Sequence, residues 1–373
     1  MTRQAMLVLE DGTTFEGVSF GAEGEAFGEA VFNTGMTGYQ ETLTDPSYCQ
    51  QIVAMTAPHI GNTGINDEDN ESRAMWVSGF VIRDASPIAS NWRSARTLDA
   101  ELKRQGITAI EIKGTRALTL HLRERGAMRA AISTEPTDAA ELAEKVRSSP
   151  HMTGADLARV VSTKEPYHVS PPMGTGQRFQ VVAVDLGIKA ATPAAMARLG
   201  CRVTVMPAWT TAEEILGLAP DGVFYSNGPG DPAACQYAVE SMRGVLAARV
   251  PLFGICLGSQ ILGQALGLGT YKLRFGHRGV NQPVQDQRTG KVQITSHNHG
   301  FALKMPDSGT GTFATDFGPA QITHVNLNDN VVEGLRLTGA PAFAVQYHPE
   351  AAPGPHDATG LFGEFCDLMG VFA

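Results

Sequence analysis

A cysteine between two glycines is the residue of this chain best suited to covalent chemistry. Residues 254–258 read Gly-Ile-Cys-Leu-Gly, follow an apolar run at 250–253 and precede a helix-like stretch at 260–266. A strand, a sharp turn and a helix form a nucleophile elbow, here with the Cys256 sulfur in place of a serine oxygen. The N–H of Leu257 can face a developing oxyanion, and the helix N-terminus favours the thiolate. The alternative is a buried cysteine beside a tight turn, since free cysteine often serves as a small apolar residue.

A histidine and a glutamate near the C-terminus can complete a catalytic set with this cysteine. Residues 347–350 read Tyr-His-Pro-Glu and follow the apolar run at 342–345. A thiol nucleophile needs a base, and the base needs a third group that holds its orientation and tautomer. His348 can be the base, and Glu350 can hydrogen-bond its far ring nitrogen. Alone, such a triplet is more often a surface turn; together with Cys256 it supplies a nucleophile, a base and an orienting group.

The composition describes an ordinary globular protein. The chain has 373 residues, 43% of them hydrophobic, and a net charge of −9, which suggests two domains, or three, and disfavours nucleic acid or an anionic membrane as the main partner. It has no apolar stretch of about 18 residues and no signal-peptide pattern. The five cysteines are scattered, without a C-x-x-C pair. This pattern indicates a reducing, cytoplasmic setting and argues against both a disulfide framework and a zinc site.

The chain divides into two regions of different pattern. Residues 1–150 combine strand-like runs, Gly-rich turns and helix-like stretches, which predicts a mixed α+β domain. Residues 151–178 are expected to be a linker, because residues 166–177 include three prolines and two glycines. Residues 179–373 are predicted to form the second domain.

In the second region strands and helices alternate. Strands are expected at 179–185, 202–206, 222–226 and 251–255, with helices between them. This alternation predicts an α/β domain with a doubly wound, mostly parallel sheet. Ligands of such sheets bind at the carboxyl ends of the strands, where residues 227–232, Cys256 and His348 all fall.

Four motifs of this region resemble the class I, triad-type glutamine amidotransferases. They are Ser-Asn-Gly-Pro-Gly-Asp-Pro at 226–232, Phe-Gly-Ile-Cys-Leu-Gly-Ser-Gln at 253–260, Asn-His-Gly-Phe at 298–301 and Gln-Tyr-His-Pro-Glu at 346–350. Because the four occur together and in the family's order, the resemblance is specific.

The N-terminal region resembles the small, glutamine-hydrolysing subunits of carbamoyl-phosphate synthetases. Its matching motifs are Phe-Asn-Thr-Gly-Met-Thr-Gly-Tyr-Gln-Glu at 32–41, Leu-Thr-Asp-Pro-Ser-Tyr at 43–48, Pro-His-Ile-Gly-Asn at 58–62 and Val-Ile-Arg-Asp at 81–84. The resemblance implies hydrolysis of L-glutamine to glutamate and ammonia. It also implies a large ATP-dependent subunit, with which this chain forms a heterodimer or a larger assembly of heterodimers. That subunit makes carbamoyl phosphate from the ammonia and bicarbonate, for arginine and pyrimidine biosynthesis.

The resemblance also assigns residues and cofactors. Cys256, His348 and Glu350 are implied to be the catalytic triad that forms a glutamyl thioester. The positions that match the family's glutamine-binding residues are Ser47, Gly228, Gly230, Leu257, Gln260, Asn298, Gly300 and Phe301. No cofactor is expected in this chain; ATP and a divalent metal are expected on the large subunit, because no P-loop motif occurs here.

Other interpretations of the same residues stay open. Gly228 and Gly230 could form a simple turn, and His297 with His299 could suggest a metal site. No metal is expected, because these histidines lack a companion carboxylate at a metal-binding spacing. A stand-alone Cys-dependent amidase, an amidotransferase subunit of a different synthetase and a non-enzymatic regulatory subunit are the alternative functions. The intact Cys256 and His348 disfavour the last of these.

Overall fold

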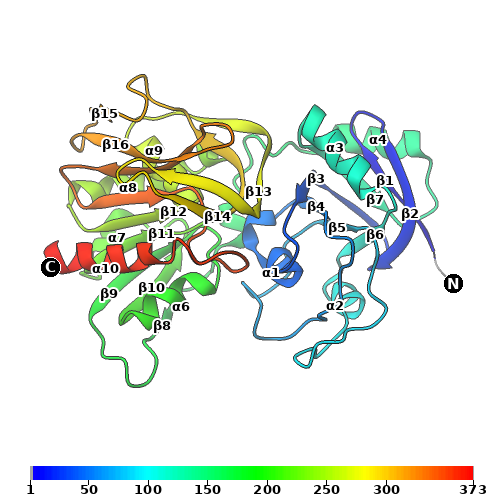
Figure 1. Ribbon diagram of the computed structural model, residues 1–373, viewed down its shortest axis with the longest axis horizontal. Helices are drawn as coiled ribbons and strands as arrows, with labels where there is room; N and C mark the ends of the chain where they lie inside the picture. The colour runs from blue at the N-terminus through cyan, green and yellow to red at the C-terminus, as the bar shows by residue number, and fades with distance from the viewer. Residues whose placement is uncertain (1–2, 373) are drawn as a thin grey trace. The chain divides into compact units, whose positions relative to one another are not determined.

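The structure, a computed structural model, describes residues 3–372, which form two compact units (Figure 1). The first unit comprises the described residues up to Thr153 together with Arg274–Gly279. The second comprises Gly154–Leu273 and the described residues from Val280 onward. Each unit has a hydrophobic core of its own, and each is described by itself below.

The first unit is built around a closed β-barrel. Its strands, in order around the barrel, are β1 (Gln4–Leu9), β2 (Thr14–Gly21), β6 (Thr108–Glu111), β5 (Gly79–Ile82), β4 (Gln51–Met55), β3 (Glu25–Asn33) and β7 (Met128–Ser133). The pairs from β3 through β4 and β5 to β6 are parallel, and the other pairs are antiparallel. The remaining elements are α1 (Tyr39–Thr44), the 3-10 helix η1 (Pro46–Tyr48), α2 (Leu98–Gln105), α3 (Thr115–Arg125) and α4 (Ala139–Ser148).

Strand β4 is buried on both of its faces. Ile52 and Ala54 belong to one buried cluster, whereas Val53 and Met55 belong to another. Because side chains alternate between the two faces of a strand, both faces of β4 are covered. An almost wholly apolar strand is the expected result of such burial.

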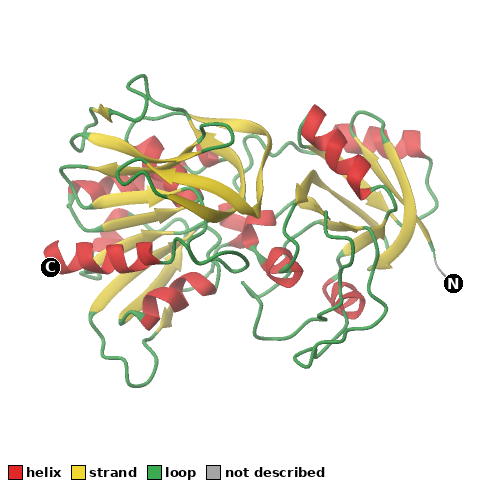
Figure 2. Cartoon of the chain, viewed as in Figure 1, coloured by secondary structure: helices red, strands yellow, loops and turns green. Residues whose placement is uncertain are grey.

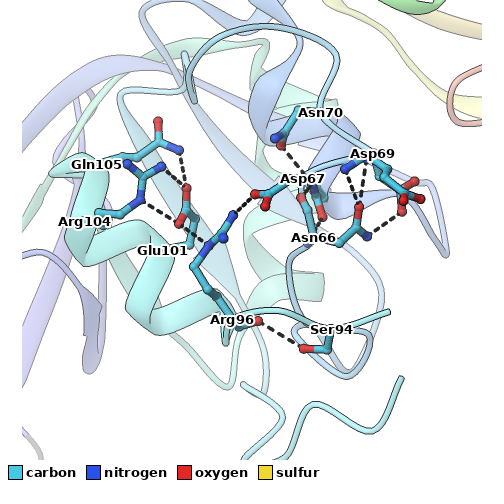
Figure 3. Close-up of polar contacts among 11 residues, drawn as sticks. Asn66, Asp67, Asp69, Asn70, Ser94, Arg96, Glu101, Arg104 and Gln105 are labelled. Atoms are coloured by element: carbon cyan, nitrogen blue, oxygen red, sulfur yellow. Dashed lines mark hydrogen bonds and ion pairs between the residues drawn. The ribbon is translucent and has the colours of Figure 1, made fainter. Parts of the chain in front are cut away.

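A polar network on helix α2 stabilises the first unit (Figure 3). The Glu101 side chain is only 3% exposed and accepts hydrogen bonds from Arg96 Nε at 3.0 Å, Arg104 Nε at 2.9 Å and Gln105 Nε2 at 2.7 Å. Arg96 also pairs with Asp67. The hydrogen bond from Arg104 outweighs the effect of burial, and the pKa of Glu101 is lowered to about 2.

The second unit contains a large sheet with helices on both faces (Figure 2). Its strands, in order across the sheet, are β14 (Val292–Leu303), β13 (Thr270–Asp286), β16 (Ala320–Asn326), β17 (Val332–Leu337), β18 (Ala342–Val345), β12 (Leu252–Ile255), β11 (Gly222–Tyr225), β9 (Phe179–Asp185), β10 (Cys201–Pro207) and β8 (Tyr167–Val169); β15 (Thr312–Phe313) pairs with β16. The strands from β18 to β10 are parallel to one another, and the flanking pairs that involve β8, β15, β16 and β17 are antiparallel. The predicted α/β fold with a mostly parallel, doubly wound sheet is therefore confirmed.

The helices of this unit are short and cover the parallel strands. They are α5 (Ala158–Val161), α6 (Ala191–Arg198), α7 (Ala212–Leu216), the 3-10 helix η2 (Pro232–Ala234), α8 (Gln236–Ala247), α9 (Leu257–Ala265) and α10 (Gly360–Phe372). Val182 and Val184 of β9 pack in the cluster that contains α8 and α9, whereas Val181 and Ala183 pack in the cluster that contains α10. None of the helices within residues 3–372 is long and apolar enough to cross a membrane.

Part of the expected linker has regular structure. Helix α5 and strand β8 fall within 151–178, and β8 pairs with β10 through Val169 and Val203. Both elements belong to the second unit. Residues 170–178, which hold two of the three prolines, have no helix or strand.

Candidate active site

Cys256 lies at the turn between β12 and α9, in a strained backbone conformation. Its φ is 53° and its ψ is −103°, a region that non-glycine residues rarely adopt. The Cys256 N–H donates to the carbonyl of Val345 at 2.9 Å, so strand β18 fixes the start of the turn. The structure thus shows a sharp strand–cysteine–helix turn with strain at the cysteine itself.

The two flanking glycines are required by close packing of the backbone. A Cβ on Gly258 would lie 2.2 Å from the carbonyl oxygen of Tyr225, and one on Gly254 would lie 2.8 Å from that of Gly258. Real Cβ atoms do not approach backbone oxygens so closely. The Gly258 N–H also donates to the carbonyl of Ser226 at 3.0 Å, which holds the turn against the end of β11.

His348 and Glu350 follow strand β18 and are both buried. His348 Nδ1 lies 2.7 Å from Glu350 Oε1, and the backbone N–H of His348 donates to the carbonyl of Ser296 on β14. Because a carboxylate only accepts, the proton of this bond is on Nδ1, and Nε2 is the nitrogen left for chemistry. Among the described residues, His348 Nε2 makes no hydrogen bond of ordinary geometry, but Cys256 is close enough to raise the pKa of the ring.

A lysine that the sequence analysis did not select completes this charge arrangement. Lys189 Nζ lies 3.1 Å from Glu350 Oε1, and its side chain is 3% exposed. Lys189 follows the turn after β9, where Asp185 Oδ1 accepts from the backbone N–H groups of Gly187 and Ile188. A lysine after a strand end carries no local signal of this role, since its partner lies 161 positions further along the chain.

Neighbouring charges determine the protonation states of His348 and Glu350. Burial alone would raise the pKa of Glu350, but the charges of Lys189 and His348 outweigh it and lower that pKa. Burial alone would lower the pKa of His348, but the charge of Glu350 outweighs it and raises that pKa. Both groups are therefore held in their charged forms near neutral pH, and His348 is an imidazolium next to Cys256.

The loop after β11 lies against the first residue of α9. A Cβ on Gly228 would be 2.0 Å from the carbonyl oxygen of Leu186 and 2.9 Å from the side chain of Leu257, so only glycine fits. Gly230 has a φ of 90°, which also favours glycine. Leu257 is the first residue of its helix, and such residues have N–H groups without an intrahelical acceptor. Backbone donors from Gly228 to Gly230 and from Leu257 are thus brought to one region.

Strand β14 borders the cysteine and holds the remaining predicted residues. Cys256 Sγ lies 3.7 Å from the carbonyl oxygen of Asn298. Gln260 Nε2 donates to the carbonyl of Phe301 at 2.7 Å and to Gln346 Oε1 at 2.9 Å. The amide nitrogen of Gln260 is therefore already used within the protein, and only its carbonyl oxygen is left for a ligand. Gly300 lies between the Asn298 and Phe301 contacts on the same strand.

Ser47 is the predicted glutamine-binding residue that belongs to the first unit. It lies in η1, is buried, and its backbone N–H donates to Asp45 Oδ1 at 2.9 Å. Its part in glutamine binding stays a prediction.

Two family profiles match separate parts of the chain. Residues 7–132 match the profile described as "Carbamoyl-phosphate synthase small chain, CPSase domain". Residues 182–368 match the profile described as "Glutamine amidotransferase class-I". The second match contains the elbow, the His348–Glu350 pair and Lys189.

Curated relatives are similar over nearly the whole chain. A carbamoyl phosphate synthase small chain of Streptomyces avermitilis is 61% identical over 368 residues, which are 98% of this chain and 96% of the relative. One of Mycobacterium tuberculosis is 57% identical over 371 residues, 98% of each chain, and one of Bifidobacterium longum is 53% identical over 381 residues, 98% of this chain and 94% of the relative. The chain therefore belongs to the carbamoyl phosphate synthase small-chain family and carries a class I glutamine amidotransferase domain.

Proposed function

We propose that this chain is the glutaminase subunit of a glutamine-hydrolysing carbamoyl phosphate synthase. The observation that supports the proposal best is the buried series Lys189, Glu350 and His348 next to Cys256, which lies on a strained elbow. A nucleophile, a base and an oriented carboxylate are what amide hydrolysis through a covalent intermediate needs.

In the first half of the proposed reaction, the sulfur of Cys256 attacks the side-chain amide carbon of L-glutamine. The thiol proton is held by His348 Nε2, and the electron pair of the carbonyl moves onto its oxygen. As that pair returns, the C–N bond breaks, and His348 gives its proton to the departing nitrogen. Ammonia leaves, and a glutamyl thioester remains on Cys256.

In the second half, His348 takes a proton from water as the water oxygen attacks the thioester carbon. The C–S bond then breaks, glutamate leaves, and the proton returns to the cysteine–histidine pair. The oxyanion of both steps is proposed to accept from the Leu257 N–H and from a backbone N–H of the Gly228–Pro229–Gly230 loop. Such preorganised donors favour the transition state because they need no reorientation during the reaction.

The glutamine itself is proposed to bind Ser47, Gly228, Gly230, Leu257, Gln260, Asn298, Gly300 and Phe301. Backbone groups next to glycine suit the charged head of an α-amino acid, because the main chain can approach it closely. The tight packing around Gly228 supports this part of the proposal.

The partner is proposed to be the large synthetase subunit, in a heterodimer or an assembly of heterodimers. ATP and a divalent metal are proposed to bind that subunit, which joins the ammonia to bicarbonate for arginine and pyrimidine biosynthesis. The setting is proposed to be the cytoplasm.

The test is glutamate release from glutamine by the purified chain, with and without the large subunit, ATP and bicarbonate. We expect strong stimulation by the partner, with carbamoyl phosphate formed in step with glutamate. High activity that the partner leaves unchanged would instead identify a stand-alone amidase. In the complex, Cys256→Ser should abolish synthesis from glutamine and leave synthesis from added ammonia intact; retained use of glutamine would overturn the assignment of the nucleophile.

A further inference from the structure

Two buried cysteines of the second unit lie in direct contact outside the candidate active site. Cys201 is the first residue of β10, and Cys366 lies within α10, the helix drawn in red in Figure 1. Their sulfur atoms are 3.6 Å apart, although the residues are 165 positions apart in sequence. They are 0% and 3% exposed, and both are free thiols. The fold therefore pairs two groups that can be oxidised, and the sequence alone does not indicate the pair.

The separation of the two sulfur atoms is small enough for a covalent bond to form after minor side-chain movement. A disulfide bond is about 2.05 Å long, so the sulfur atoms must approach by about 1.5 Å. Both residues belong to one apolar cluster, which holds their two segments together. Cys235 of the same unit differs, because its sulfur lies 3.8 Å from Asp156 Oδ1. Contact between sulfur atoms is thus not a general property of the buried cysteines.

The surroundings of the pair make the two thiols chemically unequal. The backbone N–H of Arg178 donates to the carbonyl of Gly200 at 2.8 Å, which places this cation beside the start of β10. The hydrogen bond from Cys201 lowers the pKa of Cys366 against the effect of burial. The charge of Arg178 also lowers this pKa, and the charge of Asp367 opposes it. The same hydrogen bond raises the pKa of Cys201. Cys366 is therefore the better nucleophile, and Cys201 is the donor.

Helix α10 contains features that favour local opening around Cys366. Nothing lies within 4 Å of a Cβ built on Gly363, and one built on Gly370 would meet only a ring carbon at 3.9 Å. Close packing therefore requires neither glycine, and glycine weakens a helix interior. Val371 and Phe372 in the last turn are 77% and 47% exposed. Elements with few packing contacts open more readily than core strands, which gives a small oxidant access to the helix while the sheet stays folded.

We propose that Cys201 and Cys366 form a reversible disulfide when the protein meets a peroxide, and that this bond fastens α10 to β10. The thiolate of Cys366 attacks one oxygen of hydrogen peroxide. An S–O bond forms, the O–O bond breaks, and the departing hydroxide takes up the proton that Cys366 had released. This step leaves a sulfenic acid on Cys366 and one molecule of water.

In the second step the sulfur of Cys201 attacks the sulfur of Cys366. The S–S bond forms, the S–O bond breaks, and the departing hydroxide takes the proton of Cys201 and becomes water. Two thiols and one peroxide thus give one disulfide and two waters. The two sulfur atoms together lose two electrons, which the peroxide gains. A dithiol reductant reverses the reaction by thiol–disulfide exchange.

The bond would restrict a helix that packs against the strand before the elbow. The rings of Phe362 and Phe365 lie 5.9 and 5.7 Å from the ring of Phe253 on β12. Oxidation should therefore reduce the opening of α10 and protect its backbone. In a reducing setting the pair stays in the thiol form, and disulfides in such settings are usually transient or redox-sensing. The proposal is independent of the proposed function, because it concerns the state of the thiols and not turnover.

The test is treatment of the folded, full-length chain with hydrogen peroxide at neutral pH. The peroxide is then removed, the remaining thiols are alkylated in urea, and a digest made without reductant is mapped by mass spectrometry. We expect peptides joined through Cys201 and Cys366, which separate on treatment with dithiothreitol. Hydrogen exchange of α10 peptides should be at least several-fold slower in the oxidised protein.

Cys201→Ala should lose both the joined peptides and the slower exchange, and should leave a sulfenic acid on Cys366 that dimedone traps. Arg178→Gln should slow formation of the bond several-fold, because the Cys366 thiolate loses a favourable charge. Cys235→Ser is the matched control, since Cys235 is also buried in this unit, and it should form the bond at the wild-type rate.

If Cys201→Ala does not fold, the peptide map of the wild-type protein still decides. Folded wild-type protein whose two cysteines both remain thiols after peroxide treatment would overturn the proposal. So would a disulfide that forms only when peroxide is added in urea. In either case the pair would be a packing contact between two small apolar side chains.

Discussion

Lys189 Nζ and His348 Nδ1 approach the same carboxylate oxygen, Glu350 Oε1, at 3.1 and 2.7 Å. The buried glutamate therefore lies between two cations. Removing one member of a buried ionic group commonly costs about 3–5 kcal/mol, because the remaining charge loses its counter-charge. Lys189 thus acts on the reaction through Glu350 and His348, without touching Cys256 in the contacts described above.

Lys189→Met should lower kcat for glutamine hydrolysis, by roughly tenfold or more, because Glu350 would then be less fully ionised and would hold His348 less firmly. The KM for glutamine should change much less. Steady-state kinetics checks this split, and Lys291→Met, at an exposed lysine, is the control that should leave both values unchanged. A higher KM with an unchanged kcat would show that Lys189 serves substrate binding instead.

The pH dependence of kcat/KM should report the ionisation of His348, whose pKa depends on Glu350. The charge of Glu350 raises the pKa of His348, so the imidazolium persists above the ordinary value of about 6.5 and is lost only as pH rises through the raised value. Glu350→Gln should lower that pKa and move the alkaline limb of the kcat/KM profile to lower pH. A profile measured between neutral and alkaline pH checks this. An unchanged limb in the variant would assign the limb to another group.

The elbow should not tolerate a single added methyl group. Gly258→Ala places a Cβ 2.2 Å from the Tyr225 carbonyl oxygen, so the start of α9 must shift. A displacement of about 1 Å near reacting atoms can lower turnover about 100-fold, and overpacking costs about 1–3 kcal/mol of stability. Glutamate release and thermal unfolding measure the two effects.

Gly363→Ala is the comparison for this variant, since nothing lies within 4 Å of a Cβ built there. Gly363 lies in helix α10, where alanine is favoured over glycine by about 1 kcal/mol. This change should slightly raise stability and keep activity. Loss of activity in both variants would mean that the elbow is not specially sensitive.

Acid should weaken the first unit through Glu101. Its pKa is lowered to about 2, below the ordinary value of about 4.3, so its ionised form stabilises the folded unit fully above that ordinary value. The stabilisation is lost as pH falls through the folded pKa. Glu101→Gln should be less stable than wild type at pH 7 and should lose less stability on acidification.

Hydrogen exchange of peptides from α2, measured from neutral pH down to about pH 3, follows this loss locally. Glu124→Gln, at an exposed glutamate on α3, should behave like wild type. Equal pH dependence in wild type and Glu101→Gln would show that another carboxylate controls the acid sensitivity.

The parallel part of the second unit could be predicted because its signals are local. Strand β9 contains the continuous apolar run 181–184, and the glycines around Cys256 mark a turn between an apolar strand and a helix. The long strand β13 could not be predicted in this way. It contains Gly276, Gly279 and Pro283 and lacks a regular alternation of apolar and polar residues.

The unpredicted part of the candidate active site is a contact between distant residues. Lys189 precedes Glu350, its ion-pair partner, by 161 positions. The local sequence of Lys189 does not differ from that of a lysine that faces solvent. Its role appears only when the sheet brings the strand ends together and excludes water from its charge.

Strand β14 contacts the candidate active site through three of its main-chain carbonyls. The carbonyls of Ser296, Asn298 and Phe301 meet the His348 N–H, the Cys256 sulfur and the Gln260 amide. Evolution can therefore exchange side chains along β14 one at a time. It cannot insert or delete a single residue there, because a shift of one position would exchange the two faces and misalign every contact at once.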